Sequence, residues 1–388
     1  RRAGGARGVR RMVRHRWWAM TLESRMVDFG RRLVWLLPTR IDIPLVVALA
    51  LLACASLAVV WSAGGQSTDM VIKQAMRFGV GFTLMLIAMR VPPGTWRRWT
   101  PWFFALCIAL LVAVLALGEG KGAQRWLDLG VLRFQPSELL KLGLPMMLAW
   151  YFHDRVLPPS PRSVIAALLL VALPVGLIYR QPDLGTAVLV AGSGLFVIFL
   201  AGISWWWIAT IAVLAIGSAA AAWPFLLDYQ KARVTQFLNP EADPLGSGWQ
   251  TMQSQIAVGS GGWTGKGWTE GTQSQLEFLP ERHTDFILAV LSEEFGWVGV
   301  ALLMLAYLFV IARCFWIAAN ARDTYGRLLG GAIAMTFFIY ILVNSAMITG
   351  LMPVKGVPLP LISYGGTSAV SLLIAFGILL SIHAHRRV

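Results

Sequence analysis

Apolar runs long enough to enter or cross a lipid bilayer recur along most of this chain, and they constrain its fold more than any other feature. Ten such spans can be counted: 43–64, 75–91, 101–117, 137–153, 164–180, 184–202, 204–227, 285–316, 328–350 and 367–384. A helix needs about 20 apolar residues to cross a hydrocarbon core about 30 Å thick. Only 13% of the residues are charged, which is about half the share found in a soluble domain. The sequence therefore predicts an all-α polytopic membrane protein with about ten transmembrane helices.

The eighth span is too long for a single crossing, because about 30 residues at 1.5 Å each extend about 45 Å. We therefore divide it at Gly296. Residues 285–295 are expected at the outer rim or lining a cavity, and residues 297–316 are expected to cross. The polar residues 228–284 then form a large extracytoplasmic loop between helices seven and eight.

Basic residues are distributed unevenly between the two sides of these spans. With the amino terminus inside, the inner segments hold 21 of the 33 lysines and arginines, eleven of them in residues 1–41, whereas the outer segments hold ten. The positive-inside rule then places both termini in the cytoplasm. Residues 1–41 are interpreted as a basic cytoplasmic tail, in part an artefact or the product of an upstream start, and residues 42–388 as a single transmembrane domain. No nucleotide-binding motif occurs on the inner side, so chemistry is expected at the outer face without ATP.

The segment 273–296 concentrates acidic residues in an otherwise apolar chain. Its acids are Glu277, Glu281, Asp285, Glu293 and Glu294, and Glu270 lies just upstream. Thr284 is expected to be a helix N-cap, which would place Asp285 in the first turn of the helix. An ionisable residue at membrane depth is costly and indicates a functional site by default. A carboxylate that only caps the helix and interacts with its dipole is an equal alternative.

Three other outer segments carry polar residues suited to a site. Ser137 is expected to cap a helix in which Glu138 and Lys141 are i, i+3 neighbours, either as a membrane-edge ion pair or as a cation ready for a phosphate. Asp183 is expected to cap the sixth span. Residues 350–368 contain three prolines and four glycines. Such irregular backbone is tolerated at membrane depth only against protein or a watery cavity, so a cavity open to the outside is predicted.

Four motifs in order carry a resemblance to a known family. They read GAQRWLDLG…RFQPSELLKL, QPDLGTA, GSGGWTGKGWTEGTQSQLEFLPERHTDF and PVKGVPLPLISYGGTS. From about Ile43 to the carboxyl end, the chain resembles the SEDS family (shape, elongation, division and sporulation). The wording GTQSQLEFLPERHTDF is more similar to the elongation members than to the division members. Lys355 departs from the valine or threonine expected there, and the arginine-rich tail lies outside the resemblance.

The resemblance implies a peptidoglycan glycosyltransferase of the bacterial cytoplasmic membrane. Its substrates would be lipid II and a growing glycan on undecaprenyl pyrophosphate. Attack of a sugar 4-hydroxyl on the anomeric carbon, with inversion, needs one base on the hydroxyl and positive charge on the departing pyrophosphate. Membrane lipid, a class B penicillin-binding protein transpeptidase and other elongation-complex proteins are the implied partners, and no nucleic acid is implied.

The resemblance places the essential acid at Asp285, as general base, and implies functional roles for Glu138, Lys141 and Asp183. Candidates for binding the pyrophosphate are Lys141, Arg125, Lys121, Arg282 and Lys266, with His283, Thr284, Glu281 and Ser363 in supporting positions. Because several carboxylates converge, an assisting divalent cation, Mg²⁺ or Mn²⁺, is left open, and no spacing identifies one.

Other classes of protein remain alternatives. A lipid flippase or transporter would use the same cavity and broken spans, although the inner face lacks matching polar motifs. A division-type polymerase of the same family and a scaffold that only recruits cell-wall enzymes are also open, and a scaffold would not need an acid at Asp285. A serine protease built on Ser363 would have only His283 as an outer-side base, and an ordinary turn serine is the simpler interpretation.

Overall fold

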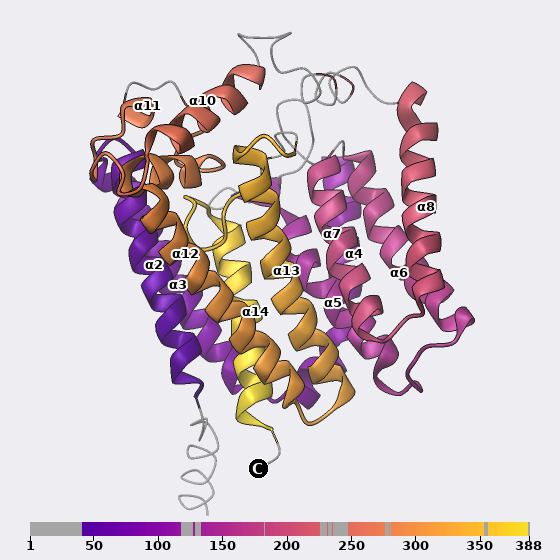
Figure 1. Ribbon diagram of the computed structural model, residues 1–388. Coiled ribbons are helices and arrows are strands. Elements are labelled where there is room, and N and C mark those ends of the chain that lie inside the picture. Colours follow the sequence, from indigo (N-terminus) through magenta and orange to yellow (C-terminus); the bar gives the residue numbers. More distant parts are fainter. Residues whose placement is uncertain are drawn as a thin grey trace, which may run out of the picture. The chain divides into compact units, whose positions relative to one another are not determined.

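In the computed structural model, the structure describes residues 41–117, 127–128, 133–181, 183–225, 231, 235, 247–275, 279, 281–352 and 356–386. The chain divides into two units, Arg1–Ile41 and Asp42–Val388, and every element considered below belongs to the second. This unit is almost entirely helical (Figure 1). The exception among the described residues is a two-residue antiparallel pair, β1 (Leu127–Asp128) with β2 (Arg133–Phe134).

Ten of the described helices overlap the ten predicted spans one to one. They are α2 (Ile43–Ala63), α3 (Thr68–Arg90), α4 (Pro93–Leu117), α5 (Pro136–His153), α6 (Pro161–Arg180), α7 (Leu184–Leu200), α8 (Trp205–Ala222), α12 (Ile287–Ala319), α13 (Thr324–Ile348) and α14 (Thr367–Ala384). Seven of them, α2, α3, α4, α6, α12, α13 and α14, are long and apolar enough to cross a membrane by length and composition. The predicted all-α polytopic membrane architecture is therefore confirmed.

The bundle is built around its last two helices. About two thirds of the apolar window of α13 is buried, and 61% of that of α14, against 22% for α3 and α12. Helix α14 packs against α3, while α13 packs against α5, α7 and α12 (Figure 1). The buried face of these helices is aliphatic and aromatic, with Phe337 and Phe376 in edge-to-face contact at 5.4 Å. The outer helices expose their other faces, as expected for surfaces solvated by lipid.

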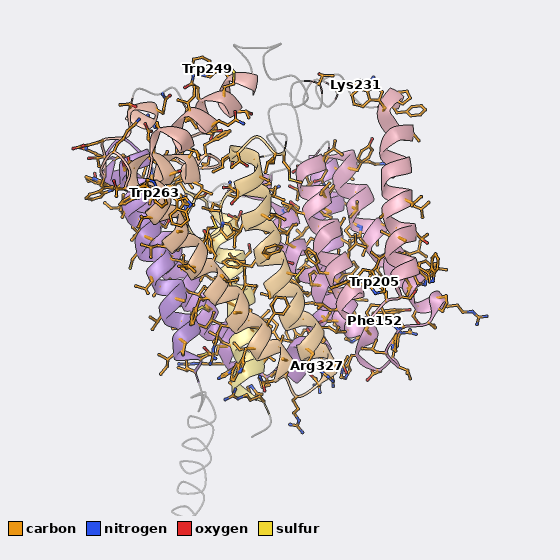
Figure 2. All side chains as sticks on the ribbon, viewed as in Figure 1. Phe152, Trp205, Lys231, Trp249, Trp263 and Arg327 are labelled. Atoms are coloured by element: carbon orange, nitrogen blue, oxygen red, sulfur yellow. The ribbon has the colours of Figure 1, made fainter. Side chains whose placement is uncertain are left out.

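The predicted outer loop 228–284 contains its own short helices, α10 (Ser247–Ser260) and α11 (Thr272–Gln275), and follows the 3₁₀ turn η1 (Trp223–Phe225). Figure 2 places Trp249 of α10 and Lys231 at one end of the bundle, and Arg327 of α13 at the opposite end. Helix α10 docks on the end of α13, where the Ser254 hydroxyl donates to the Ile348 carbonyl at 2.9 Å. The loop is therefore attached to the helices that surround the site.

Helix α12 is broken at Gly296, as its length predicted. Gly296 has φ 62° and ψ −161°, a region that is essentially restricted to glycine. The break interrupts the i to i−4 ladder, and backbone groups that are left unpaired away from water are costly. Residues 261–267, which we call the glycine loop, supply the replacements. The four hydrogen bonds are Lys266 N to Glu293 O (3.0 Å), Gly267 N to Glu294 O (3.1 Å), Trp297 N to Gly262 O (2.9 Å) and Val298 N to Trp263 O (3.1 Å).

This insertion requires closely approaching backbones. A Cβ atom at Gly261 would lie 2.0 Å from the Ser292 carbonyl oxygen, and one at Gly265 would lie 2.1 Å from the Glu294 carbonyl oxygen. A Cβ at Gly296 would lie 2.4 Å from the Gly265 nitrogen. The glycine loop and the break therefore form one spliced unit, in which the loop completes the hydrogen bonding of the broken helix.

Replacing Gly296 by alanine should destabilise the protein. The alanine would occupy a backbone region that costs about 1–3 kcal/mol, and its Cβ would overlap the glycine loop. We expect a clearly lower midpoint of thermal unfolding in detergent for Gly296→Ala. Gly176→Ala in α6 is the control, because a Cβ there meets no atom within 4 Å. Equal melting temperatures for the two variants would contradict the splice.

Candidate active site

Asp285 lies in the turn 281–286, directly before α12 begins at Ile287. The N-cap of α12 is Phe286, which makes no side-chain capping bond, and no acid occupies the first turn. The prediction that Thr284 caps this helix with Asp285 in its first turn is therefore wrong. The Thr284 hydroxyl donates instead to the carboxylate of Glu281 at 2.8 Å and to its carbonyl at 3.1 Å.

Side chains that are distant in sequence hold the backbone of this turn outside the helix, so that α12 begins at Ile287 and does not include Asp285. The Ser363 hydroxyl donates to the Thr284 carbonyl at 2.5 Å, and the Asn344 amide donates to the Asp285 carbonyl at 2.8 Å. The carboxylate of Asp285 makes no hydrogen bond or ion pair with any residue that the structure describes. A Cβ placed on Gly356 would lie 3.3 Å from its Oδ2. The backbone is thus fixed, while the carboxylate stays available.

The segment 356–366, which we call the proline segment, faces the turn 281–286 and forms the other wall of the candidate site. Its backbone is irregular, and side chains and loop backbone supply the missing hydrogen bonds. The contacts are Asn344 to Val357 O (2.7 Å), Tyr307 to Pro360 O (2.7 Å), Ser56 to Ile362 O (2.7 Å), Gln74 to Ser363 O (3.2 Å), Leu359 N to Ser363 Oγ (2.7 Å) and Tyr364 N to His283 O (2.9 Å). The predicted condition for irregular backbone at membrane depth, pairing with protein groups, is met for these groups.

Both walls contain a residue in the left-handed region of backbone space. Glu281 has φ 56° and Leu361 has φ 58°. Each such conformation costs on the order of 1–3 kcal/mol and tends to be retained at functional sites. Their occurrence on the two facing segments is consistent with a site at this position.

A cavity with about 710 Å³ of space free of atoms, part of it open to solvent, lies behind the proline segment. Glu138 and Lys141 of α5, Tyr340 of α13 and Ser363 supply polar groups to its lining, and the rest of the lining is mainly apolar. Asp285 does not line this cavity. Ser363 links the two places, because its hydroxyl holds the turn that carries Asp285.

The predicted pair in α5 is confirmed as an ion pair. Lys141 Nζ lies 2.6 Å from Glu138 Oε1, with both side chains largely buried, and 4.9 Å from the centroid of the Tyr340 ring. The expected cap at Ser137 is wrong, because α5 begins at Pro136 after Gln135, which makes no capping bond with its side chain. A cation in mostly apolar surroundings interacts strongly with an anion because water screens it poorly.

The other predicted residues fall into three groups. Asp183 is the N-cap of α7, as predicted. Its two carboxylate oxygens accept from the Thr186 backbone amide (3.2 Å) and from the Thr186 hydroxyl (2.8 Å). Arg282 and His283 lie half-buried in the same turn as Asp285, and the His283 ring contacts Tyr364 edge-on at 5.8 Å. Lys266 lies in a separate network with Glu293.

The remaining predictions concern residues that the structure does not describe. Lys121, Arg125, Glu277 and Lys355 lie outside the described ranges. Within those ranges, no three histidine, cysteine or acidic residues converge in a way that could hold a metal ion.

Burial sets the protonation of the turn before α12. It raises the pKa of Asp285 to about 6, and the negative charge of Glu281 acts in the same direction. Burial also lowers the pKa of His283, although Glu281 opposes this effect. Near neutral pH the turn therefore carries a carboxylate that is mostly ionised and more basic than an ordinary aspartate, beside a neutral imidazole. A general base is most efficient when its pKa lies near the working pH.

Two residues that contact the candidate site escaped the sequence analysis. Asn344 is fully buried in α13 and bridges the Asp285 and Val357 carbonyls. Tyr340 lies one turn earlier on the same helix and faces Lys141. A polar amide within an apolar span, here one turn before the end of α13, is a signal that could have pointed to Asn344.

These features define a class of protein: a polytopic helical membrane protein with an available, basic carboxylate before a broken helix, next to a mainly apolar cavity that holds a buried ion pair. The family model FtsW/RodA/SpoVE, described as "Cell cycle protein", matches residues 35–388. The chain belongs to this family, which confirms the resemblance found in its motifs.

Known relatives are similar to this chain over 88–90% of its length. Peptidoglycan glycosyltransferase MrdB of Escherichia coli (strain K12) is 50% identical over 345 residues, covering 88% of this chain and 93% of that protein. A solved structure described as "Structural coordination of polymerization and crosslinking by a peptidoglycan synthase complex" matches with a TM-score of 0.80 and 32% identity, covering 90% of this chain and 99% of that one. The crystal structure of Thermus thermophilus rod shape determining protein RodA matches with a TM-score of 0.69 and 29% identity, covering 90% and 98%.

The ionisation of Asp285 can be tested without any activity. A carboxyl titration in detergent, followed by infrared difference spectroscopy against Asp285→Asn, should show Asp285 titrating near pH 6. Glu281→Gln removes the neighbouring negative charge and should move this titration to lower pH. Glu270→Gln, at an exposed acid of the same outer loop, should leave it unchanged. A titration of Asp285 near pH 4 in the unmodified protein would contradict the burial that the structure gives it.

Proposed function

We propose that this chain is a peptidoglycan glycosyltransferase that joins lipid II disaccharides into β-1,4 glycan strands and releases undecaprenyl pyrophosphate. The observation that carries the proposal is the Asp285 carboxylate. It pairs with no described residue, its backbone is fixed by Ser363 and Asn344, and burial raises its pKa to about 6. Membership of the family, and 50% identity to a protein named as a peptidoglycan glycosyltransferase, support the reaction.

Asp285 acts as the general base. It removes the proton from the 4-hydroxyl of the acceptor sugar while that oxygen attacks the anomeric carbon of the donor. The new C1–O4 bond forms as the bond from C1 to the pyrophosphate oxygen breaks on the opposite face, so an α-linked donor becomes a β-linked product. The proton remains on Asp285 and then passes to water, which a pKa of about 6 permits at neutral pH. Base catalysis of this kind contributes about 10²–10⁴-fold.

Lys141 stabilises the departing pyrophosphate. Its ammonium lies in a cavity that is mainly apolar, where a charge acts strongly on a developing anion. Glu138, 2.6 Å away, fixes the position of that ammonium. Because the two side chains pair on one face of α5, replacing either residue alone would leave the other as an unpaired buried charge.

The chain acts during cell elongation, together with a class B penicillin-binding protein transpeptidase. The similarity to a rod shape determining protein supports the process. The similarity to a member of a synthase complex, described by polymerization and crosslinking together, supports a crosslinking partner.

A transporter is the second candidate, favoured by the cavity and the broken helix, which transporters also use. The inner ends of the bundle favour the polymerase. Arg313 of α12 holds Asp42 before α2 at 2.7 Å, and Arg97 of α4 lies 3.7 Å from Asp323 before α13. An alternating-access motion that separates these helix ends would have to break both contacts. Synthesis of glycan by purified protein in detergent, where no gradient exists, separates the two functions.

The proposed location is the bacterial cytoplasmic membrane, with both termini in the cytoplasm and the Asp285 turn at the outer face. The excess of basic residues in the inner segments supports this orientation, and Lys231 and Arg327 lie at opposite ends of the bundle (Figure 2). A topology reporter inserted near Ser247 should therefore be read outside the cytoplasm. A cytoplasmic signal there would reverse the orientation and refute an outer-face site.

Replacing Asp285 by asparagine should abolish glycan synthesis while preserving the fold. Asparagine keeps the size and hydrogen-bonding reach of the side chain and removes the base, so lipid II polymerisation should fall by about 10²–10⁴-fold. Binding of lipid II should persist. Purified protein, lipid II and gel analysis of the glycan products provide the measurement.

The control for this substitution is Asp154→Asn. Asp154 is the C-cap residue that follows α5, and its side chain is 93% exposed, so the same chemical change there should leave polymerisation intact. Near wild-type polymerisation by well-folded Asp285→Asn would assign the base to another residue.

A further inference from the structure

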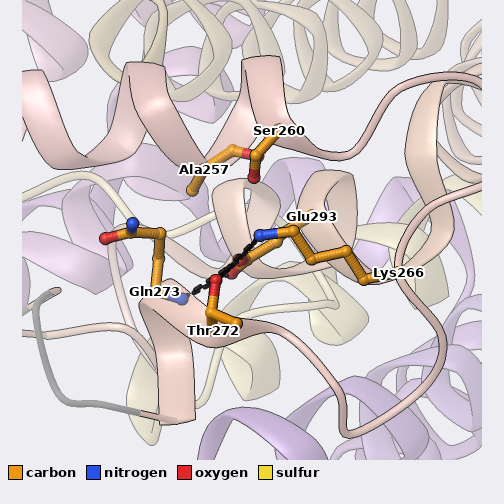
Figure 3. A network of polar contacts seen from close by, with 6 residues as sticks. All are labelled: Ala257, Ser260, Lys266, Thr272, Gln273 and Glu293. Atoms are coloured by element: carbon orange, nitrogen blue, oxygen red, sulfur yellow. Dashed lines mark hydrogen bonds and ion pairs between the residues drawn. The ribbon is translucent and has the colours of Figure 1, made fainter.

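A second carboxylate, Glu293, lies fully buried near the end of the short half of α12, residues 287–295. Figure 3 shows the donors that converge on it. Glu293 Oε1 accepts from Lys266 Nζ at 2.6 Å, from the Thr272 hydroxyl at 3.0 Å and from the backbone amide of Gln273 at 3.0 Å. We call these four residues the latch. The proposed reaction gives none of them a chemical step.

The latch joins two different parts of the chain. The three donors come from the outer loop, and the acceptor comes from the half-helix. Lys266 also donates to the Thr272 hydroxyl at 2.8 Å, which orders the donors among themselves. Its backbone amide is one of the four bonds that splice the glycine loop into the break at Gly296. The side chain and the backbone of Lys266 therefore hold the same junction.

The half-helix needs such a junction because the break disconnects it from residues 297–319. Its residues 287–294 are all buried, so it transmits displacement as a rigid element instead of bending locally. The turn that carries Asp285 is mounted directly on its amino-terminal end. Glu293 follows Asp285 by eight residues, about 12 Å along a helix. The latch can therefore set the position of Asp285, but it is too distant to contact a sugar there.

We infer that Lys266 and Glu293 are positioning residues for the glycosyl transfer: their ion pair locks the glycine loop into the break of α12 and so fixes the half-helix that presents Asp285. The inference rests on the proposed function. It also replaces the expectation that Lys266 binds pyrophosphate, because the ammonium is bound to Glu293, about 12 Å along the helix from Asp285.

A buried charge makes this role separable from phosphate binding. Lys266→Met leaves Glu293 ionised and buried without its cation, which is strongly destabilising for a buried pair. Lys266→Met combined with Glu293→Gln removes that charge, and the amide oxygen still accepts from Thr272 and Gln273. If Lys266 acts in the latch, Glu293→Gln should therefore restore activity to Lys266→Met. If Lys266 binds pyrophosphate, Glu293→Gln should not restore it.

The test compares the single variant, the double variant and the unmodified protein in lipid II polymerisation. A misplacement of about 1 Å costs about 10²-fold, so Lys266→Met should lower kcat by about 10²-fold with little change in KM. The double variant should recover to within about tenfold of the unmodified protein on the same scale. Lys266→Arg, which keeps the charge, should also retain most of the activity.

The pH profile distinguishes positioning from a general loss of folded protein. The charged or titratable groups of the turn around Asp285 are Glu281, Arg282 and His283. A loosened half-helix admits water to this turn, so the acid limb of kcat/KM should move to lower pH in Lys266→Met and return in the double variant. Loss of folded protein alone would reduce the amplitude without moving the limb.

Hydrogen exchange provides a readout independent of activity. Amides of residues 281–295 should exchange faster in Lys266→Met and regain protection in the double variant. Lys231→Met is the control in the same outer loop, since Lys231 donates only to a nearby carbonyl at 3.3 Å among the described contacts.

Two results overturn the latch while the unmodified protein still polymerises lipid II: a double variant no more active than Lys266→Met, or unchanged exchange and an unmoved acid limb. Absence of polymerisation by the unmodified protein would refute the proposed function instead, and the exchange experiment would still decide whether the latch holds the half-helix.

Discussion

The architecture of this site depends on one backbone interaction, the insertion of the glycine loop into the break of α12. Breaking a helix leaves backbone carbonyls and amides without helical partners, and the loop pairs two of each. That exchange lets a single membrane helix be divided into a crossing segment and a short buried half-helix. Asp285 lies just before the first residue of this half-helix, outside the helical segment. Without the splice, Asp285 would lie at the end of a helix too long for the bilayer.

The site combines opposing demands on one carboxylate. Burial makes Asp285 more basic, but an unpaired charge in such surroundings is unfavourable. Ser363 and Asn344 hold the backbone on either side of this carboxylate, and no described residue pairs with its charge, which leaves it available for the proposed substrate hydroxyl. Lys141, in contrast, is paired with Glu138 in the neighbouring cavity. The proposed base and the proposed cation are thus held by different elements, on either side of the strained proline segment.

Features set by local spacing were predictable from the sequence, and features set by distant contacts were not. Apolar length predicted the ten helices and the break at Gly296, and i, i+3 spacing predicted the Glu138–Lys141 pair. The cap expected at Thr284 failed because Ser363, 79 residues away, takes its carbonyl. The commitment of Lys266 to Glu293 was equally hidden, since 27 residues separate them. Motif resemblance selected Asp285, but only the fold shows why its carboxylate is available and basic.

The most direct measurement of the central claim is a structure of the Asp285→Asn protein with lipid II and a lipid-linked glycan bound. We expect the acceptor 4-hydroxyl within about 3.2 Å of the side chain at position 285, the distance that proton transfer requires. We expect the donor pyrophosphate on the side of Lys141. An acceptor hydroxyl that faces a different side chain, with position 285 out of reach, would contradict the assignment of Asp285 as the base.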